Sequence, residues 1–281
     1  MRRYLDDLQF ILKNGKRRSN RTGIDTISVF GMQTRYNLAD GFPAVTTKKL
    51  AWKAVVSELL WFIEGSVDER RLAEILYGTR DSSKQTIWTA NANASYWKHK
   101  AIFEGDLGRI YGVQWRQWGP RIGERVDQLQ NLIEGIKTNP DGRRHIITAW
   151  NPGELEQMAL PPCHMFAQFN IADGKLDCLM YQRSNDYFLG CPFNIASYSL
   201  LTHMIAQICN LRVGELIHTN GDAHIYVNHL EQVKEQLKRE PLTLPKLWLN
   251  PTITDITKFT MDDIKLIDYT HYEPIKAEMA V

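Results

Sequence analysis

The chain has 281 residues, and its 34 basic and 32 acidic side chains leave a formal net charge of +2. So small a charge argues against attraction of the whole surface to nucleic acid or membranes, and any site for an anion must therefore be local. With 43% hydrophobic and 10% aromatic residues and no linker rich in proline, glycine or serine, residues 1–281 are predicted to form one folded domain, not a disordered chain.

The N-terminus and the cysteines bear on the compartment. The segment MRRYLDDLQF contains acidic side chains and no apolar signal-peptide region, and no later run approaches the ~18 apolar residues of a membrane span. The cysteines, Cys163, Cys178, Cys191 and Cys209, show neither C-x-x-C pairs nor zinc-like spacing to histidine. We therefore expect a cytoplasmic protein with reduced thiols, no metal and no membrane contact.

The first expected elements are a helix and an arginine-rich turn. Apolar residues recur at helical spacing from Arg3 to Leu12, and this segment ends toward Gly15. The turn sequence RSNRTG, residues 18–23, precedes an alternating stretch over residues 26–36 that is typical of a strand. An arginine loop ahead of a strand can grip a phosphate, although a solvated basic turn is the simpler interpretation of this loop alone.

A long apolar helix carries a carboxylate. The pattern from Lys48 to Glu64 is helical and ends at Gly65, and Glu58 lies within it among hydrophobic residues. A carboxylate in such surroundings is either paired with a base or kept for proton chemistry, and burial raises its pKa. The residues alone leave both interpretations open.

Residues 68–77 predict another short helix, and an irregular aromatic-rich stretch follows through Trp115. Irregular stretches of this length in a compact chain are usually functional or disordered, and the aromatic content argues against disorder. Trp88, Asn91 and Tyr111 are therefore candidates to stack on a flat ligand or to hydrogen-bond to it. A place in the core is the alternative for Trp88.

Two adjacent arginines open a predicted strand. An amphipathic helical pattern over residues 126–136 ends in the turn TNPDG, after which Arg143 and Arg144 precede the strand-like HIITAW. Neighbouring strand residues point to opposite faces, so both arginines reach one site only if the backbone bends there. Otherwise the two side chains have different roles.

Residues 160–198 concentrate the reactive groups of the chain. The pair Asp173-Gly174 between two extended segments is a strong hairpin signal, with Cys163 at the start of the first segment and Arg183 at the end of the second. Such a hairpin brings the guanidinium beside the thiol, which favours the nucleophilic thiolate. An ordinary buried cysteine is the alternative, because free cysteine is among the most buried residue types.

A buried helix and a second turn are expected next. Residues 192–210 are apolar on most sides, which predicts a buried helix with Asn194 in its first turn, where backbone N–H groups point. The Asn-Gly pair at residues 220–221 predicts a turn before an alternating stretch that places His224 and Tyr226 on one strand face. These two side chains suit a sugar hydroxyl, and a metal pair is disfavoured because no third ligand has matching placement.

A set of separated motifs occurs in a specific order along the chain. They are NRTG, FPAVTTKK, ELLWFIEG, IW, GDLGRIYGVQWR, DGRRHIITAWNP, LPPCH, QRSNDYFLGCPFNIASY, GDAHIYVNH and IKAEMAV. This ordered set resembles the thymidylate synthase family over essentially the whole chain. The resemblance implies an α+β fold, a single domain with a large twisted mixed β-sheet covered by helices, in which the sheet forms a homodimer interface.

The resemblance also implies an activity. The protein would methylate deoxyuridylate (dUMP) to thymidylate (dTMP) with 5,10-methylenetetrahydrofolate as carbon donor and reductant, leaving dihydrofolate. Cys163, as thiolate, would add to C6 of the pyrimidine and turn C5 into a nucleophile. Asn194 would pair with O4 and N3 of uracil because an amide both donates and accepts hydrogen bonds. Glu58 would move protons with Tyr111 and ordered water.

Ligand contacts follow from the same resemblance. The expected catalytic residues are Cys163, Glu58, Tyr111, Arg183, Asp186 and Asn194. The expected contacts to dUMP are Arg21, Arg183, Ser184, Asn194, His224 and Tyr226, with Arg143 and Arg144 reaching across from the partner subunit. The expected contacts to the folate are Lys48, Ile87, Trp88, Asn91, Asp186, Leu189, Gly190, Phe193 and Val281. A tail that ends in Val281 would close over the ligands and exclude water.

Relatives in this family that hydroxymethylate deoxypyrimidine nucleotides are the runner-up, because they capture the exocyclic methylene with water instead of hydride. Asn185 occurs in them, whereas many synthases have a smaller residue there. Their deoxycytidylate-specific members tend to have Asp in place of Asn194, so we expect uracil as the base. Two positions depart from the family pattern: Thr89, where an acidic residue is common, and Arg109, where proline is common. Neither departure removes a chemical group from the expected mechanism. A protein that binds RNA or nucleotides through the same arginines is a distant alternative, which a steep salt dependence of affinity would reveal.

Overall fold

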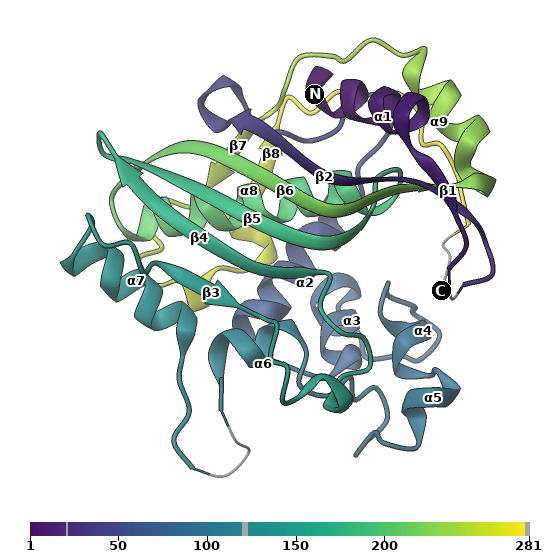
Figure 1. Ribbon diagram of the computed structural model, residues 1–281. Coiled ribbons are helices and arrows are strands. Elements are labelled where there is room, and N and C mark those ends of the chain that lie inside the picture. The colour runs from purple at the N-terminus through teal and green to yellow at the C-terminus, as the bar shows by residue number, and fades with distance from the viewer. Residues whose placement is uncertain (21, 120–122, 279–281) are drawn as a thin grey trace.

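A computed structural model describes residues 1–20, 22–119 and 123–278 of the protein. Its centre is a twisted sheet with the strand order β1-β2-β6-β5-β4-β3 (Figure 1). Neighbouring strands are antiparallel except β5 and β6, so the sheet is mixed. Its strands are β1 (Lys16–Arg18), β2 (Thr26–Asn37), β3 (Ile146–Thr148), β4 (His164–Ala172), β5 (Lys175–Asp186) and β6 (Arg212–Tyr226).

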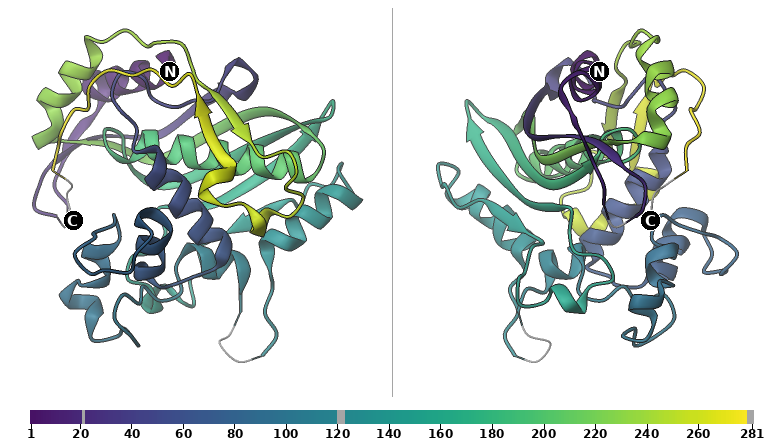
Figure 2. Two further views of the ribbon diagram at one scale, coloured as in Figure 1. Left: turned by 180° about the vertical axis from the view of Figure 1, so that it is seen from behind. Right: turned by 45° about the vertical axis from the view of Figure 1, so that its right-hand side comes forward.

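Helices cover one face of this sheet. In Figure 1, α8 lies behind β5 and β6, and Figure 2, which also shows the view from behind, places α2 and the β7-β8 pair on that same side. The expected α+β class, with a mixed sheet covered by helices, is therefore confirmed. The helices are α1 (Arg2–Asn14), α2 (Trp52–Glu64), α3 (Glu69–Tyr77), α4 (Thr89–Ala92), α5 (Ser95–Lys98), α6 (Tyr111–Arg116), α7 (Gln128–Thr138), α8 (Gly190–Ile208) and α9 (Leu230–Leu237). The small second sheet pairs β7 (Lys246–Leu249) with β8 (Ile264–Ile267).

The main core lies between α8 and the sheet. Leu200, Leu201 and Met204 of α8 are fully buried, as are Cys178 and Met180 on the inner face of β5. Full burial of one such aliphatic side chain contributes about 1.5–3 kcal/mol relative to exposure. A helix that is apolar nearly all round must be buried, which explains why α8 runs beneath the sheet instead of over its edge.

The predicted central hairpin is present. Asp173 and Gly174 connect β4 to β5 with φ angles of 51° and 69°, the two positive values that a type I′ turn requires. A bulge between His164 and Phe166 shifts the register by one residue, and Arg183 N–H donates to the carbonyl oxygen of Cys163 across 2.8 Å. The turn therefore returns the chain to the cysteine, as the sequence predicted.

The predicted Asn-Gly turn is wrong. β6 runs unbroken through residues 220–221, and Asn220 is paired with Met32 on β2 and with Gln182 on β5. A central strand gains a hydrogen-bonded ladder on both sides, which outweighs the local turn preference of Asn-Gly. The rings of His224 and Tyr226 nevertheless meet edge to face, with centroids 5.2 Å apart.

Element boundaries also differ from the predictions. α2 begins at Trp52, so Lys48 precedes it in an irregular segment. α8 begins at Gly190, which makes Asn194 its fifth residue and places it just past the first turn. β3 begins at Ile146, so the two arginines before it lie outside the strand and the objection from strand geometry does not apply. The irregular aromatic stretch contains three short helices, α4, α5 and α6.

Candidate active site

The cysteine at the start of β4 is held against an arginine. Nη2 of Arg183 lies 3.9 Å from Sγ of Cys163, and the same guanidinium donates from Nε to Pro162 O (2.8 Å) and from Nη2 to Pro161 O (2.9 Å). The two prolines lack N–H groups, and their carbonyl oxygens anchor the arginine. A fixed positive charge beside the sulfur favours the thiolate, which is the nucleophilic form.

Tyr111, the first residue of α6, joins the cysteine to a group of aromatic rings. Its hydroxyl oxygen accepts a hydrogen bond from Cys163 N–H across 2.7 Å. Its ring stacks on His164 with centroids 4.2 Å apart and meets Trp88 edge to face at 5.9 Å. Burial raises the pKa of Tyr111 well above its ordinary value, so the phenol keeps its proton and can serve as a hydrogen-bond donor.

The buried carboxylate of α2 connects to the same group. Trp88 Nε1 donates to Glu58 Oε1 across 2.7 Å, and both side chains are 6% exposed. Burial raises the pKa of Glu58 from 4.5 to about 7, and the Trp88 hydrogen bond opposes this rise. Glu58 therefore has the expected perturbed pKa, and at neutral pH it can both release and accept a proton.

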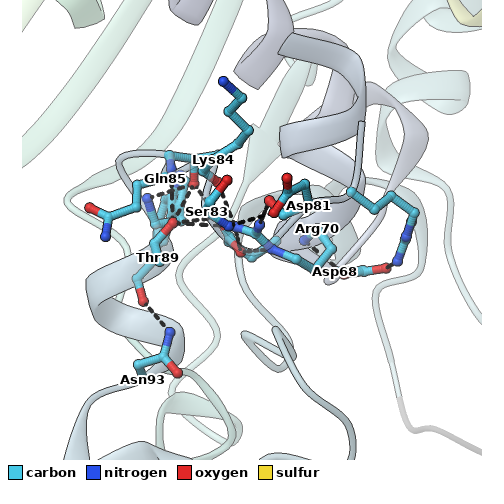
Figure 3. A network of polar contacts seen from close by, with 12 residues as sticks. Asp68, Arg70, Asp81, Ser83, Lys84, Gln85, Thr89 and Asn93 are labelled. Carbon is cyan, nitrogen blue, oxygen red and sulfur yellow. Dashed lines mark hydrogen bonds and ion pairs between the residues drawn. The ribbon is translucent and has the colours of Figure 1, made fainter. Parts of the chain in front are cut away.

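A polar network fixes the loop that carries Trp88. Buried Glu69, at the start of α3, accepts hydrogen bonds from the hydroxyls of Thr86 and Thr89, each across 2.6 Å. Arg70 forms a two-pronged ion pair with Glu69. Arg70 also donates to the carbonyl oxygens of Asp81 and Lys84 (Figure 3). The hydroxyl of Thr89 therefore donates a hydrogen bond to Glu69. An ionised acidic side chain at this position has no proton to donate.

Three buried polar residues behind the cysteine were not predicted from the sequence. His218 Nε2 lies 3.0 Å from Gln182 Oε1, and Gln182 Nε2 donates to Asn194 Oδ1 across 3.0 Å. Burial lowers the pKa of His218 to about 3, so the ring is neutral and donates through Nε2. The third is His164, whose Nδ1 lies 2.9 Å from the hydroxyl of Tyr198. The sequence pattern that could have predicted them is a polar side chain at an inner-face position of an otherwise apolar strand.

Five of the predicted site residues share one cavity. It has a volume of about 600 Å³, and Cys163, Arg183, Ser184, His224 and Tyr226 line it together with residues of the segments 18–20, 96–100 and 155–161. Asn194 is not among the residues that line it. Thiol, guanidinium, hydroxyl and imidazole groups therefore face a common space. A nucleotide-sized molecule with an anionic group fits this set of functions.

A sequence model of the thymidylate synthase family matches residues 2–281. The chain belongs to the thymidylate synthase family. This family comprises transferases of nucleotide biosynthesis that use methylenetetrahydrofolate and generally act as homodimers. It includes hydroxymethylases as well as methylating enzymes.

The family's expected folate residues gather around the start of α8. Asp186 Oδ1 accepts hydrogen bonds from the backbone N–H groups of Phe188 (3.0 Å) and Leu189 (3.1 Å). Lys48 donates from Nζ to Phe188 O, and burial lowers the pKa of Lys48 to about 7. A Cβ on Gly190 would lie 3.8 Å from Asp186 Cβ. That separation is an ordinary van der Waals contact, so the space beside this glycine has room for about one methyl group.

Other expected residues of the family are exposed, half-buried or part of the core, or lie outside the described residues. Ile87 is 45% exposed, and Arg143 and Arg144 are exposed and absent from the lining of the 600 Å³ cavity. Asn91 and Phe193 are half-buried. Trp88 belongs to the core, with its ring 6.0 Å from that of Trp61, as well as bonding to Glu58. Arg21 and Val281 lie outside the described residues.

Within residues 1–20, 22–119 and 123–278, no group of three His, Cys, Asp or Glu side chains is placed to hold a metal ion. No helix among them is long and apolar enough to cross a membrane.

Proposed function

We propose that this family member is a thymidylate synthase that converts dUMP to dTMP with 5,10-methylenetetrahydrofolate and releases dihydrofolate. The observation that carries the proposal is the Cys163–Arg183 pair, which opens on the same cavity as Ser184, His224 and Tyr226. A thiolate nucleophile beside groups suited to a phosphate and a sugar hydroxyl is what covalent attack on a nucleotide base needs.

The cavity supports binding of the nucleotide by several polar groups. Arg183 and Ser184 hold the phosphate, together with Arg21, and the edge-to-face pair of His224 and Tyr226 binds the deoxyribose hydroxyl. His224 is itself oriented by Asp222, whose Oδ1 lies 3.0 Å from its Nδ1. Charged guanidinium groups suit phosphate because several N–H donors meet its oxygens at once.

The orientation of Asn194 supports uracil as the base. Because Gln182 donates to Asn194 Oδ1, the Nδ2 amino group of Asn194 is left to donate to the base. The uracil O4 atom accepts a hydrogen bond from such a donor, whereas the 4-amino group of cytosine would meet donor with donor. Neutral His218 donates to Gln182 Oε1, and this contact fixes the orientation of the Gln182 amide that donates to Asn194.

The chemical step assigns a role to each remaining group. The thiolate of Cys163 forms a bond to pyrimidine C6, which makes C5 nucleophilic toward the one-carbon unit. The bound folate supplies this carbon and the hydride that reduces it. Glu58, with a pKa of about 7, relays protons near the base, and Tyr111 keeps its proton and acts as a donor.

The residues around the start of α8 fit a pterin ring. Asp186 accepts two backbone hydrogen bonds through Oδ1, which leaves Oδ2 to accept from a ring N–H. Lys48, Leu189, Gly190 and Phe193 are further proposed contacts of the folate, as are Ile87, Trp88 and Asn91 at the start of α4 and within it. Further along, His229 Nε2 donates to Glu278 O across 2.6 Å. This contact supports a tail that closes over both ligands and excludes water.

The outer face of the sheet supports a homodimer. Phe30 on β2 is 78% exposed and Ile146 on β3 is 42% exposed. Phe166 and Tyr181 stack on each other with centroids 5.8 Å apart and are only half-buried. Large exposed apolar side chains on one face mark an interaction surface. In such a dimer the exposed Arg143 and Arg144 are available to the site of the other subunit.

A dUMP hydroxymethylase of the same family is the second candidate. The buried amide of Asn185, 1% exposed, favours it because a buried polar group can hold water. In that reaction water captures the exocyclic methylene and tetrahydrofolate is returned unoxidised.

Mass spectrometry of the nucleotide product decides between the two candidates. The protein is incubated with dUMP and methylenetetrahydrofolate while dihydrofolate is followed by absorbance. dTMP with an equal amount of dihydrofolate supports the synthase. Hydroxymethyl-dUMP with tetrahydrofolate establishes the hydroxymethylase instead, and the absence of both products refutes the proposed function.

A further inference from the structure

A pair of buried amides lies beside the start of α8. Asn185 of β5 and Asn220 of β6 are each 1% exposed, and Asn185 Nδ2 donates to Asn220 Oδ1 across 2.8 Å. Within the part of the chain that the structure describes, Asn185 Oδ1 and Asn220 Nδ2 have no hydrogen-bond partner. Two facing amides therefore leave one acceptor and one donor unpaired in the interior.

This imbalance calls for a small polar partner. Turning both amides over would again leave one donor and one acceptor unpaired, because each amide has one oxygen and one NH₂ group. Each unpaired buried group destabilises the fold, because it has lost its hydrogen bonds to water without replacement. The thiol of Cys191 interacts with Asn185, but a thiol is only a weak donor. A water molecule donates and accepts at once, and a buried water typically makes about three hydrogen bonds.

The position of the pair connects it to the candidate active site. A Cβ on Gly190 would lie 3.8 Å from Asn185 Oδ1 and 3.7 Å from Asn194 Oδ1. The two amide oxygens thus flank the space that this glycine leaves open. Asn194 is the residue proposed to read the base, so a water at Asn185 lies next to the residue that reads it.

We propose that Asn185 and Asn220 hold a water molecule beside Gly190, and that this water competes with hydride for the reacting methylene. The inference rests on the proposed function, because that reaction creates the methylene. The water oxygen bonds to the exocyclic carbon as its double bond to C5 opens toward the ring. The C6–S bond to Cys163 then breaks, the thiolate leaves and one water proton passes to a neighbouring base. Tetrahydrofolate is released without oxidation, so no further oxidant or reductant is needed.

The water site itself is tested without any reaction. A crystal structure of the full chain without ligands, at a resolution that shows ordered water, is expected to contain a water within hydrogen-bond distance of Asn185 Oδ1 and Asn220 Nδ2. A pair without such a water overturns the proposal, whatever the enzyme's products are.

The chemical consequence is tested by the product ratio in heavy-oxygen water. The wild type is expected to form dTMP with a minor hydroxymethyl product that carries the heavy isotope. Asn185→Ala and Asn220→Ala should each lower the ratio of hydroxymethyl product to dTMP about tenfold, as the loss of about 1.4 kcal/mol of positioning energy would. Two variants are used because each replaces a buried side chain, and a variant that fails to fold cannot be assayed. Ser199→Ala is the matched control, because its hydroxyl on α8 is also buried and has no partner among the described residues.

The outcomes separate this inference from the proposed function. An unchanged ratio in both folded asparagine variants, or dTMP without any labelled hydroxymethyl product in the wild type, overturns the water proposal alone. A similar fall in Ser199→Ala also overturns it, because loosening of α8 would then explain the effect. Absence of dTMP and of the hydroxymethyl product from the wild type refutes the proposed function, and the water proposal with it.

Discussion

The indole nitrogen of Trp88 donates a hydrogen bond to Oε1 of Glu58 across 2.7 Å, and both side chains are buried. This single contact joins a loop to the apolar helix α2 and keeps a carboxylate in a dry environment. The environment, and not the hydrogen bond, raises the pKa of Glu58 to about 7.

The raised pKa of Glu58 predicts that stability falls as the pH rises. The folded state binds the proton more tightly than the unfolded state, so this contribution is complete below pH 4.5 and is lost as the pH passes about 7. The size is on the order of 3 kcal/mol, at about 1.4 kcal/mol per pKa unit. Glu58→Gln should lack this decline between pH 4.5 and 7. Urea unfolding of both proteins across that range checks it, and parallel curves would contradict the assignment.

Cys163→Ser should abolish turnover and leave nucleotide binding largely intact. A serine hydroxyl is a far weaker nucleophile at neutral pH, but it preserves the size and shape of the side chain. The measurement is the rate of dTMP formation together with calorimetric titration of dUMP. Cys209→Ser, which changes a cysteine remote from the cavity, is the matched control. Appreciable turnover in Cys163→Ser would remove this residue from the role of nucleophile.

Asn194→Asp should shift the preference toward deoxycytidylate. One oxygen of the new carboxyl keeps the hydrogen bond from Gln182, and the protonated carboxyl donates to N3 of cytosine and accepts from its amino group. Competition between the two nucleotides for the variant and the wild type measures this shift. Unchanged preference would mean that another residue reads the base.

Mixing inactive Cys163→Ser and Arg143→Ala chains should restore activity if subunits share their sites. Each mixed dimer then contains one complete site, so random exchange gives about one quarter of the wild-type activity. Arg143 is exposed and does not line the cavity of its own chain, which is why sharing is expected. Native mass spectrometry must show that mixed dimers form. No recovery in such a sample would count against the shared site.

Glu69→Ala should weaken the loop that carries Trp88. The Glu69–Arg70 pair is buried, with side chains 2% and 11% exposed, and removing one partner of a buried pair costs roughly 3–5 kcal/mol. The KM for the folate should rise more than the KM for dUMP, because this loop faces the proposed pterin side. Glu74→Ala, which breaks exposed pairs with Arg71 and Arg80, should destabilise the protein far less, because exposed ion pairs contribute little. Equal destabilisation in the two variants would contradict the role of the buried network.

The sequence by itself determined those features that depend on a few neighbouring residues. Asp173-Gly174 specified the hairpin because these residue types tolerate the positive φ angles of a type I′ turn. The same short-range logic placed α1, α3 and α8, and it identified Glu58 as a carboxylate in an apolar helix. The approach of Arg183 to Cys163 also followed, because a hairpin returns its second strand to the start of the first. Which residue lies opposite the cysteine was set by the bulge between His164 and Phe166.

Only the tertiary structure decided what depends on segments far apart in the chain. Asn220-Gly221 has the composition of a turn, yet its place between β2 and β5 makes it part of a central strand. The donor order from His218 through Gln182 to Asn194 arises from the register of β5 with β6 and from the packing of α8 beneath them. Local preferences amount to about 1 kcal/mol per residue, whereas burial and completed hydrogen-bond ladders sum over whole elements. For that reason the contacts that orient the site were settled by the fold and not by any one motif.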